Sequence, residues 1–254
     1  MFYRRAIFIE ATGNQVCSEV EDDFHHFRVT FTHDDSRIVD IKAQSVRYPW
    51  SACGRPSEDH FASLEGLQLK QLRAQLDRTD YFNCCTHMSD IFDLGVNLVL
   101  RGDQSRLYEI AVAVLPGGAA ESAVISRNGK EQLAVQISKG KITLPDGLAS
   151  VTIDQLNAWA KQRYSKETRF DNNIELISVL QRAIYVSFGK GYDWQDRETA
   201  DQMMLPPVCF TMATQRASQA TRMHGSDRDY SAIPDMLLGG RVKELREQLL
   251  AKSG

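Results

Sequence analysis

Alternating apolar and polar residues predict strands in the first part of the chain. Segments 6–11, 24–32 and 37–46 alternate in this way or are rich in β-branched residues, which is typical of strands. The polar residues 33–36 separate the second segment from the third. We therefore expect these two segments to form a hairpin.

Helical spacing follows the strands, and the same order then repeats. After a break at Tyr48-Pro49-Trp50, apolar residues recur at helical intervals over about 61–77 and 86–101. Further strands are expected over 107–115, 120–127 and 132–138, with Asn128-Gly129 as a two-residue hairpin turn. Further helices are expected at about 152–164, 172–189, 214–223 and 240–252.

Two successive blocks of strands followed by helices predict an α+β fold with antiparallel sheets packed against helices. We expect one α+β domain over residues 1–254, with sub-blocks 1–103 and 104–254. The repeated order is compatible with a divergent duplication, although no residue-level repeat supports one.

Composition narrows the class of partner. The chain has 254 residues, of which 43% are hydrophobic and 25% charged, as expected of a globular protein. The net charge is −3 and the Lys and Arg residues are scattered, so we expect no nucleic-acid partner. No apolar run is long enough for a signal peptide or a membrane span, so we expect a cytoplasmic protein without a membrane partner. The sequence does not decide whether the chain forms homo-oligomers.

The odd number of cysteines, five, argues against a disulfide framework. Cys53 precedes a predicted helix, where exposed backbone amides can lower a thiol pKa; the alternative is a buried cysteine beside Trp50. Cys53, Cys85, His87 and His25 are acceptable zinc ligands, but finger-type spacings are missing. We therefore expect no metal.

Residues 83–90 (Asn-Cys-Cys-Thr-His-Met-Ser-Asp) hold the densest set of reactive side chains. Thr86 is expected to cap the following helix. His87 and Asp90 are three residues apart and so share one helix face, where the carboxylate can orient the imidazole for proton transfer. His25 and His26 are adjacent near a strand start and must point to opposite faces, so they cannot both enter one site through that strand.

Aromatic residues flank these segments. Tyr48, Trp50, Tyr81, Phe82 and Phe92 either form a pocket that stacks an aromatic substrate or pack in the core. The polar run Ser226-Asp227-Arg228-Asp229 either holds an anionic or phenolic ligand through Arg228 or is solvated. Phosphate-binding, dinucleotide-binding and nucleophile-elbow motifs are missing from the sequence, which argues against the commonest nucleotide, NAD and hydrolase classes.

Several ordered motifs resemble one bacterial family over most of the chain. They are Asp22-Asp23-Phe24-His25-His26-Phe27, Arg47-Tyr48-Pro49-Trp50 with Cys53, Asn83-x-Cys85-Thr86-His87-x-x-Asp90, Cys209-Phe210 and Gly225-Ser226-x-Arg228-Asp229. The chain resembles the family called domain of unknown function 2889, from which Cys84 and Met88 are local departures. The resemblance implies aromatic and acyl-CoA catabolism. It also implies kinship with a cofactor-independent lyase that opens lignin-derived phenylcoumarans and releases formaldehyde.

By similarity, the candidate positions are His25, His26, Tyr48, Trp50, Cys53, Cys85, His87, Asp90, Ser226, Arg228 and Asp229. The expected function is a lyase acting on a lignin-type aromatic dimer without a cofactor. His87 with Asp90 would supply the base, and Tyr48 or a second histidine, His25 or His26, would supply the proton. Arg228 or Tyr230 would hold a substrate phenol. Trp50, Cys53, Cys85, Phe92, Ser226 and Asp229 are further expected binding residues.

Two alternatives belong to other classes. One is a non-catalytic thiol or metal-binding accessory protein, of iron–sulfur or zinc type, that uses Cys53, Cys85 and His87. The other is a hydratase or thioesterase for aromatic acyl-CoA.

Overall fold

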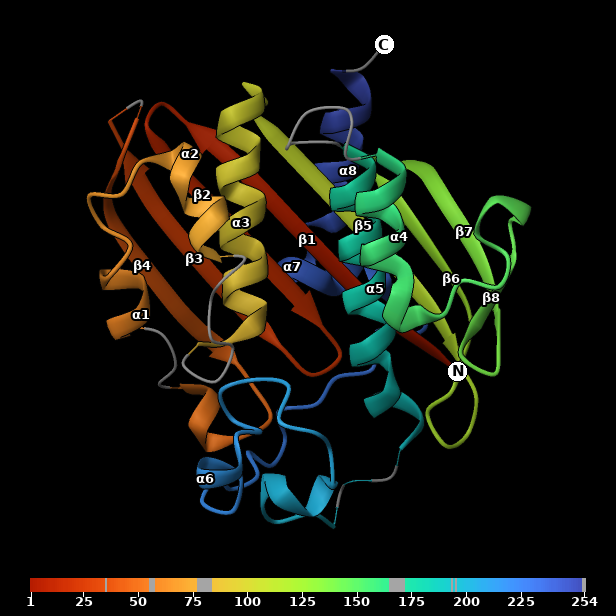
Figure 1. The fold of residues 1–254 in the computed structure, drawn as a ribbon. Coiled ribbons are helices and arrows are strands. Elements are labelled where there is room, and N and C mark those ends of the chain that lie inside the picture. Colours follow the sequence, from red (N-terminus) through yellow and green to blue (C-terminus); the bar gives the residue numbers. More distant parts are fainter. Residues whose placement is uncertain are drawn as a thin grey trace. The chain divides into compact units, whose positions relative to one another are not determined.

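The computed structural model describes residues 1–34, 36–54, 58–76, 84–164, 172–192, 194 and 196–252, with the backbone alone for 58–59 and 73–76. The chain divides into two compact units. Unit 1 comprises Met1–Ala6, Leu107–Asp193 and Asp229–Gly254, and unit 2 comprises Ile7–Arg106 and Trp194–Arg228. The expected mixed α+β class is confirmed by antiparallel strands and packed helices in each unit (Figure 1).

The strands of unit 2 follow the order β4-β3-β2-β1. They are β1 (Phe2–Thr12), of which residues from Ile7 onward belong to this unit, β2 (Gln15–Asp22), β3 (His26–His33) and β4 (Ile38–Arg47). Strands β3 and β4 pair antiparallel, which confirms the predicted hairpin. In β3 every second residue is buried, as expected of a strand with one face on the core.

Strand β2 was not predicted, because its charged residues hide its pattern. It pairs antiparallel with β3, and its last five residues, 18–22, are all buried. Among them, Glu19, Glu21 and Asp22 are carboxylates that bind neighbouring side chains and backbone. Buried charges are tolerated when they are paired in this way.

Helix α3 (Thr86–Arg101) covers β2 and β3 (Figure 1). Its N-cap is Cys85, whose side chain makes no capping hydrogen bond, so the expectation that Thr86 caps the helix is wrong. Thr86 is instead the first helical residue. Gly102 ends the helix in the left-handed conformation (φ 74°), which glycine adopts at little steric cost.

The helix expected over 61–77 is two helices, α1 (Glu58–Ala62) and α2 (Leu69–Leu76). A turn separates them and ends at Gly66, whose φ of +77° is incompatible with a continuous helix. Among the described residues of unit 2 there are also the short helices η1 (Ser51–Gly54), η4 (Ala200–Met203) and α6 (Thr214–Ala217). The last is shorter than the helix expected near 214–223.

Unit 1 contains a meander in the order β5-β6-β7-β8. The strands are β5 (Ser105–Val114, in this unit from Leu107), β6 (Ala120–Arg127), β7 (Lys130–Ser138) and β8 (Lys141–Leu144). Asn128 and Gly129 both have positive φ, 52° and 76°, as the predicted hairpin turn requires.

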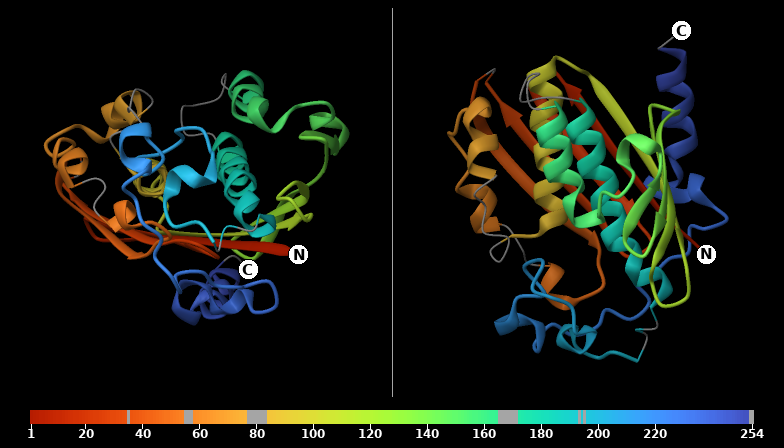
Figure 2. Two further views of the ribbon diagram at one scale, coloured as in Figure 1. Left: turned by 90° about the horizontal axis from the view of Figure 1, so that it is seen from below. Right: turned by 45° about the vertical axis from the view of Figure 1, so that its right-hand side comes forward.

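The helices of unit 1 lie on both sides of its strands. Helix α5 (Asn172–Gly191) packs on β6, and α4 (Leu156–Tyr164) packs on α5, where the two run side by side (Figure 2). The C-terminal elements lie on the other side of the strands (Figure 2): η5 (Pro234–Met236), α7 (Leu237–Gly240) and α8 (Val242–Ala251). The short helices η2 (Asp146–Leu148) and η3 (Ile153–Gln155) precede α4. Within the described residues, every helix is too short or too polar to cross a membrane.

Candidate functional site

The turn between β2 and β3 is organised by the Asp22 carboxylate. Its Oδ1 accepts backbone N–H groups from Phe24 and His25, each at 2.8 Å, an arrangement typical of aspartate in a turn. The same oxygen lies 3.1 Å from Nδ1 of His25. Asp22 is fully buried, whereas 13% of the His25 side chain is exposed. One carboxylate therefore fixes both the turn and the imidazole ring.

His87, from the first turn of α3, stacks on His25. The ring centroids are 4.1 Å apart and the ring planes differ by 29°. Phe27 lies beside both rings, with centroid distances of 5.7 Å to His25 and 5.8 Å to His87. One ligand-type atom from each of Asp22, His25 and His87 lies within 4.8 Å of the others. We call these three residues the imidazole–carboxylate cluster.

The partner expected for His87 was Asp90. Asp90 is half-buried on α3, three residues after His87. The carboxylate that the structure shows in contact with an imidazole of the cluster is that of Asp22, which comes from a different element. A role for Asp90 in orienting His87 stays a prediction.

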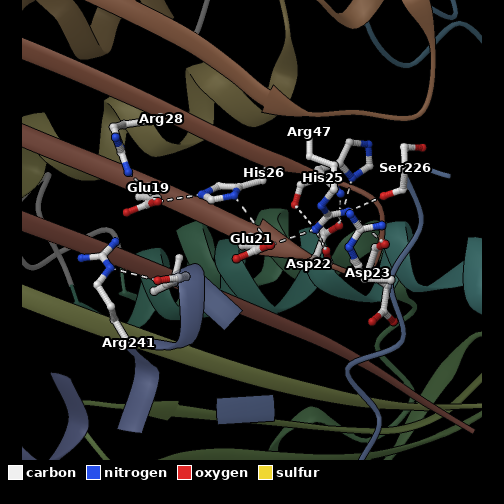
Figure 3. Close-up of polar contacts among 12 residues, drawn as sticks. Glu19, Glu21, Asp22, Asp23, His25, His26, Arg28, Arg47, Ser226 and Arg241 are labelled. Carbon is white, nitrogen blue, oxygen red and sulfur yellow. Dashed lines mark hydrogen bonds and ion pairs between the residues drawn. The ribbon is translucent and has the colours of Figure 1, made fainter. Parts of the chain in front are cut away.

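His26 has different partners from His25. Its Nε2 lies 2.6 Å from Glu19 Oε1, and its Nδ1 lies 3.6 Å from Glu21 Oε1. Arg28 also binds Glu19, at 2.9 Å (Figure 3). The two adjacent histidines therefore serve separate groups of side chains, as the alternation of a strand requires.

Arg47, the last residue of β4, ties the turn to the rest of unit 2 (Figure 3). Its Nη2 donates to the Asp22 carbonyl at 2.6 Å and to Glu21 Oε1 at 3.1 Å. Its Nη1 donates to the carbonyls of Asp23, at 3.2 Å, and Ser226, at 2.9 Å. Arg47 is therefore a positioning residue for the cluster.

The predicted aromatic residues are packed among other rings. Phe92 is fully buried between Phe31 and Phe61. Trp50 is 2% exposed and lies 5.8 Å, centroid to centroid, from Trp194. The sequence left open whether these aromatic residues form a substrate pocket or pack in the core, and the structure shows Trp50 and Phe92 packed in the core. Tyr81, Phe82 and Asn83 lie outside the described residues.

Arg222 covers this tryptophan pair. Its guanidinium lies 3.8 Å from the Trp194 ring centroid and 5.4 Å from that of Trp50, and it forms an ion pair with Asp227. Burial lowers the pKa of Arg222, while Asp227 opposes that shift. Because its guanidinium lies over two buried rings, Arg222 holds the backbone around it against Trp50.

The buried thiols are protonated groups. Burial raises the pKa of Cys53 to about 12 and that of Cys85 well above its ordinary value. Of the two alternatives for Cys53, the structure therefore shows the buried cysteine, because desolvation of the thiolate outweighs any lowering of the pKa by backbone amides. Cys53 Sγ lies 3.1 Å from the Thr211 hydroxyl.

The remaining predicted residues do not join the cluster by any contact that the structure shows. Tyr48 is half-buried against Gly54, where a Cβ would lie 2.6 Å from the tyrosine hydroxyl. Ser226 is buried and accepts from Arg47 through its carbonyl. Arg228 is exposed and donates to the carbonyls of Gly225 and Asp227. In unit 1, Asp229 pairs with Lys190 at 2.8 Å, and Tyr230 is buried.

Residues 9–98 match the family described as Protein of unknown function (DUF2889). The match covers 90 of the 254 residues, and this region is similar to the DUF2889 family. The matched region contains the whole imidazole–carboxylate cluster and Arg47, whereas Cys209 and the 225–229 motif lie beyond it. No curated protein matches the chain.

Asp22 and Arg47 are residues of this candidate site that the sequence analysis did not single out. Both stand inside motifs that carry the family resemblance, and Asp22-x-x-His25 has the spacing of an aspartate that closes a turn onto an imidazole. A sequence pattern that marks Asp22 as a partner of His25 was therefore present. The same pattern also occurs at ordinary strand ends, however, and nothing in the sequence links it to α3.

Proposed function

We propose that this protein is a cytoplasmic enzyme that transfers protons with the His25 and His87 imidazoles on an aromatic substrate. The observation that carries the proposal is the contact of two imidazoles with each other and of one with a buried carboxylate. Asp22 accepts the Nδ1 proton of His25, which leaves Nε2 of a neutral ring as the basic atom. Histidine is the commonest general acid and base near neutral pH.

The family resemblance suggests the reaction. A base removes the γ-hydroxyl proton of a phenylcoumaran dimer, and the adjoining carbon–carbon bond breaks to release formaldehyde. The electron pair of that bond forms the stilbene double bond and expels the ring oxygen as a phenolate, which an acid protonates. The products together contain the atoms of the substrate, so the step needs no oxidant or reductant.

This reaction needs one base and one acid close together, which matches the composition of the cluster. His25, oriented by Asp22, is assigned as the base, and His87 as the group that returns the proton. Phe27 lies beside both rings and gives each of them an apolar neighbour. Arg47 holds the turn that carries Asp22 and His25.

The test is incubation of metal-stripped protein with a phenylcoumaran dimer, following formaldehyde and stilbene together. Equal amounts of the two products are expected, with each of His25→Ala and His87→Ala slowing the reaction by about 10²–10⁴-fold. His224→Gln is the matched control, because this histidine side chain is 65% exposed. Folded protein without turnover, or equal losses in the control, would contradict the proposal.

An aromatic acyl-CoA hydratase or thioesterase could use the same acid and base. Binding of an aromatic CoA thioester, with hydration or hydrolysis and no formaldehyde, would replace the lyase assignment with that one.

A further inference from the structure

The imidazole–carboxylate cluster has the donor atoms of a transition-metal site. Two imidazole nitrogens and one carboxylate oxygen, from the end of β2, the following turn and α3, lie within 4.8 Å of one another. Zinc and its neighbours in the first transition row bind this mixture of nitrogen and oxygen, whereas Mg²⁺ and Ca²⁺ prefer oxygen ligands. Three protein ligands leave a fourth position for water or substrate.

The spacing is close to what such an ion needs. With bonds of about 2.0–2.1 Å, a tetrahedral ion holds its ligand atoms about 3.3 Å apart. The three side chains would therefore close by at most about 1.5 Å from the 4.8 Å limit, which small ring rotations supply. His25 and His87 are each partly exposed.

The carboxylate of the cluster is fixed by its surroundings. Asp22 is fully buried, and Arg47 binds the turn that carries it through the carbonyls of Asp22 and Asp23. Backbone N–H groups hold Asp22 in place as outer-shell partners.

We propose that Asp22, His25 and His87 bind one divalent transition-metal ion of the zinc class. An imidazole that binds the ion through one nitrogen carries its proton on the other nitrogen, so neither ring can then act as a base. If the proposed function is correct, binding therefore inhibits the reaction, but the binding itself does not depend on that function. Cys53 and Cys85 are buried thiols outside this group of ligand atoms and are not part of the site.

The test is calorimetric titration of the metal-stripped, full-length protein with Zn²⁺, together with the visible spectrum of the Co²⁺ form. We expect one ion per chain and Co²⁺ bands without a sulfur charge-transfer band. Affinity should fall by more than about 100-fold in Asp22→Asn, His25→Ala and His87→Ala, since removing an outer-shell partner alone costs about 10–100-fold. It should not change in His224→Gln or Cys53→Ser.

The wild-type protein provides a second readout if a variant fails to fold. In nitrogen NMR spectra, Zn²⁺ should shift the imidazole signals of His25 and His87 but not those of His224. No binding, binding that persists in His25→Ala and His87→Ala, or a charge-transfer band lost in Cys85→Ser would overturn the proposal. Binding without turnover would keep the metal site and reject the lyase, and turnover without binding would do the reverse.

Discussion

The packing of α3 against the sheet of unit 2 places His87 beside His25, and Gly95 is where that packing is closest. A Cβ at Gly95 would lie 2.7 Å from Ser18 Oγ, 2.9 Å from Phe31 Cε1 and 3.2 Å from Val16 Cγ1. All three neighbouring side chains are at most 1% exposed, so none can turn toward solvent. We therefore predict that Gly95→Ala is destabilising.

The size of the effect follows from two opposing contributions. In a helix, alanine is favoured over glycine by about 1 kcal/mol. Overpacking a filled core costs about 1–3 kcal/mol. Because two of the three contacts are shorter than 3.0 Å, we expect the upper part of that range and a net loss of about 1–2 kcal/mol in the free energy of unfolding.

Urea denaturation of four variants tests this argument: wild type, Gly95→Ala, Ser18→Ala and the double variant. Ser18→Ala removes the nearest contact atom, so Gly95→Ala should cost less in that background than in wild type. A stabilisation of about 1 kcal/mol by Gly95→Ala in wild type, as at an open helix position, would refute the close approach of α3 to β2 and β3.

Further predictions concern three other described residues. Because burial raises the pKa of Cys53 to about 12, about one thiol in ten thousand is ionised at pH 8, so Cys53 should react with a thiol reagent only after unfolding. This folded-state pKa exceeds the unfolded value of about 8.5, so the free energy of unfolding should fall as pH rises from about 8.5 toward 12. The fall should be smaller in Cys53→Ala. Equal dependence of the unfolding free energy on pH in the two proteins would be inconsistent with the buried thiol. Burial and then Asp154 raise the pKa of Tyr185 to about 12, so Asp154→Asn should lower it in an absorbance titration at alkaline pH, and an unchanged midpoint would count against that contact. Arg47→Met leaves the buried Glu21 without its guanidinium and should cost about 3–5 kcal/mol in urea denaturation, whereas a cost under about 1 kcal/mol would deny Arg47 its positioning role.

Local pattern was sufficient for several elements of the fold. The β3–β4 hairpin alternates clearly, and Asn128-Gly129 has the turn chemistry of the β6–β7 hairpin. Strand β2 was not predicted because Glu19 and Glu21 occupy buried positions, whereas a charged residue in a strand usually indicates an exposed position. The split of the helix expected over 61–77 depends on the conformation of Gly66, which spacing of apolar residues does not reveal.

The candidate site was predictable in its residue types but not in its pairing. His25 and His87 stand out as imidazoles, yet they are 62 positions apart in the sequence, and the packing of α3 on β2 and β3 brings them together. Helical spacing offered Asp90 as a partner, whereas the contact that the structure shows for His25 comes from Asp22, at the end of a strand. Tertiary contacts of this kind have no local sequence signal.

The most direct test of the central claim, that His25 and His87 act together, is a kinetic double-variant cycle. Rates of formaldehyde and stilbene formation would be measured for wild type, His25→Ala, His87→Ala and the double variant. Residues that act as one unit are non-additive, so the double variant should be about as slow as either single variant. Losses that multiply, or single variants with wild-type rates, would contradict the account.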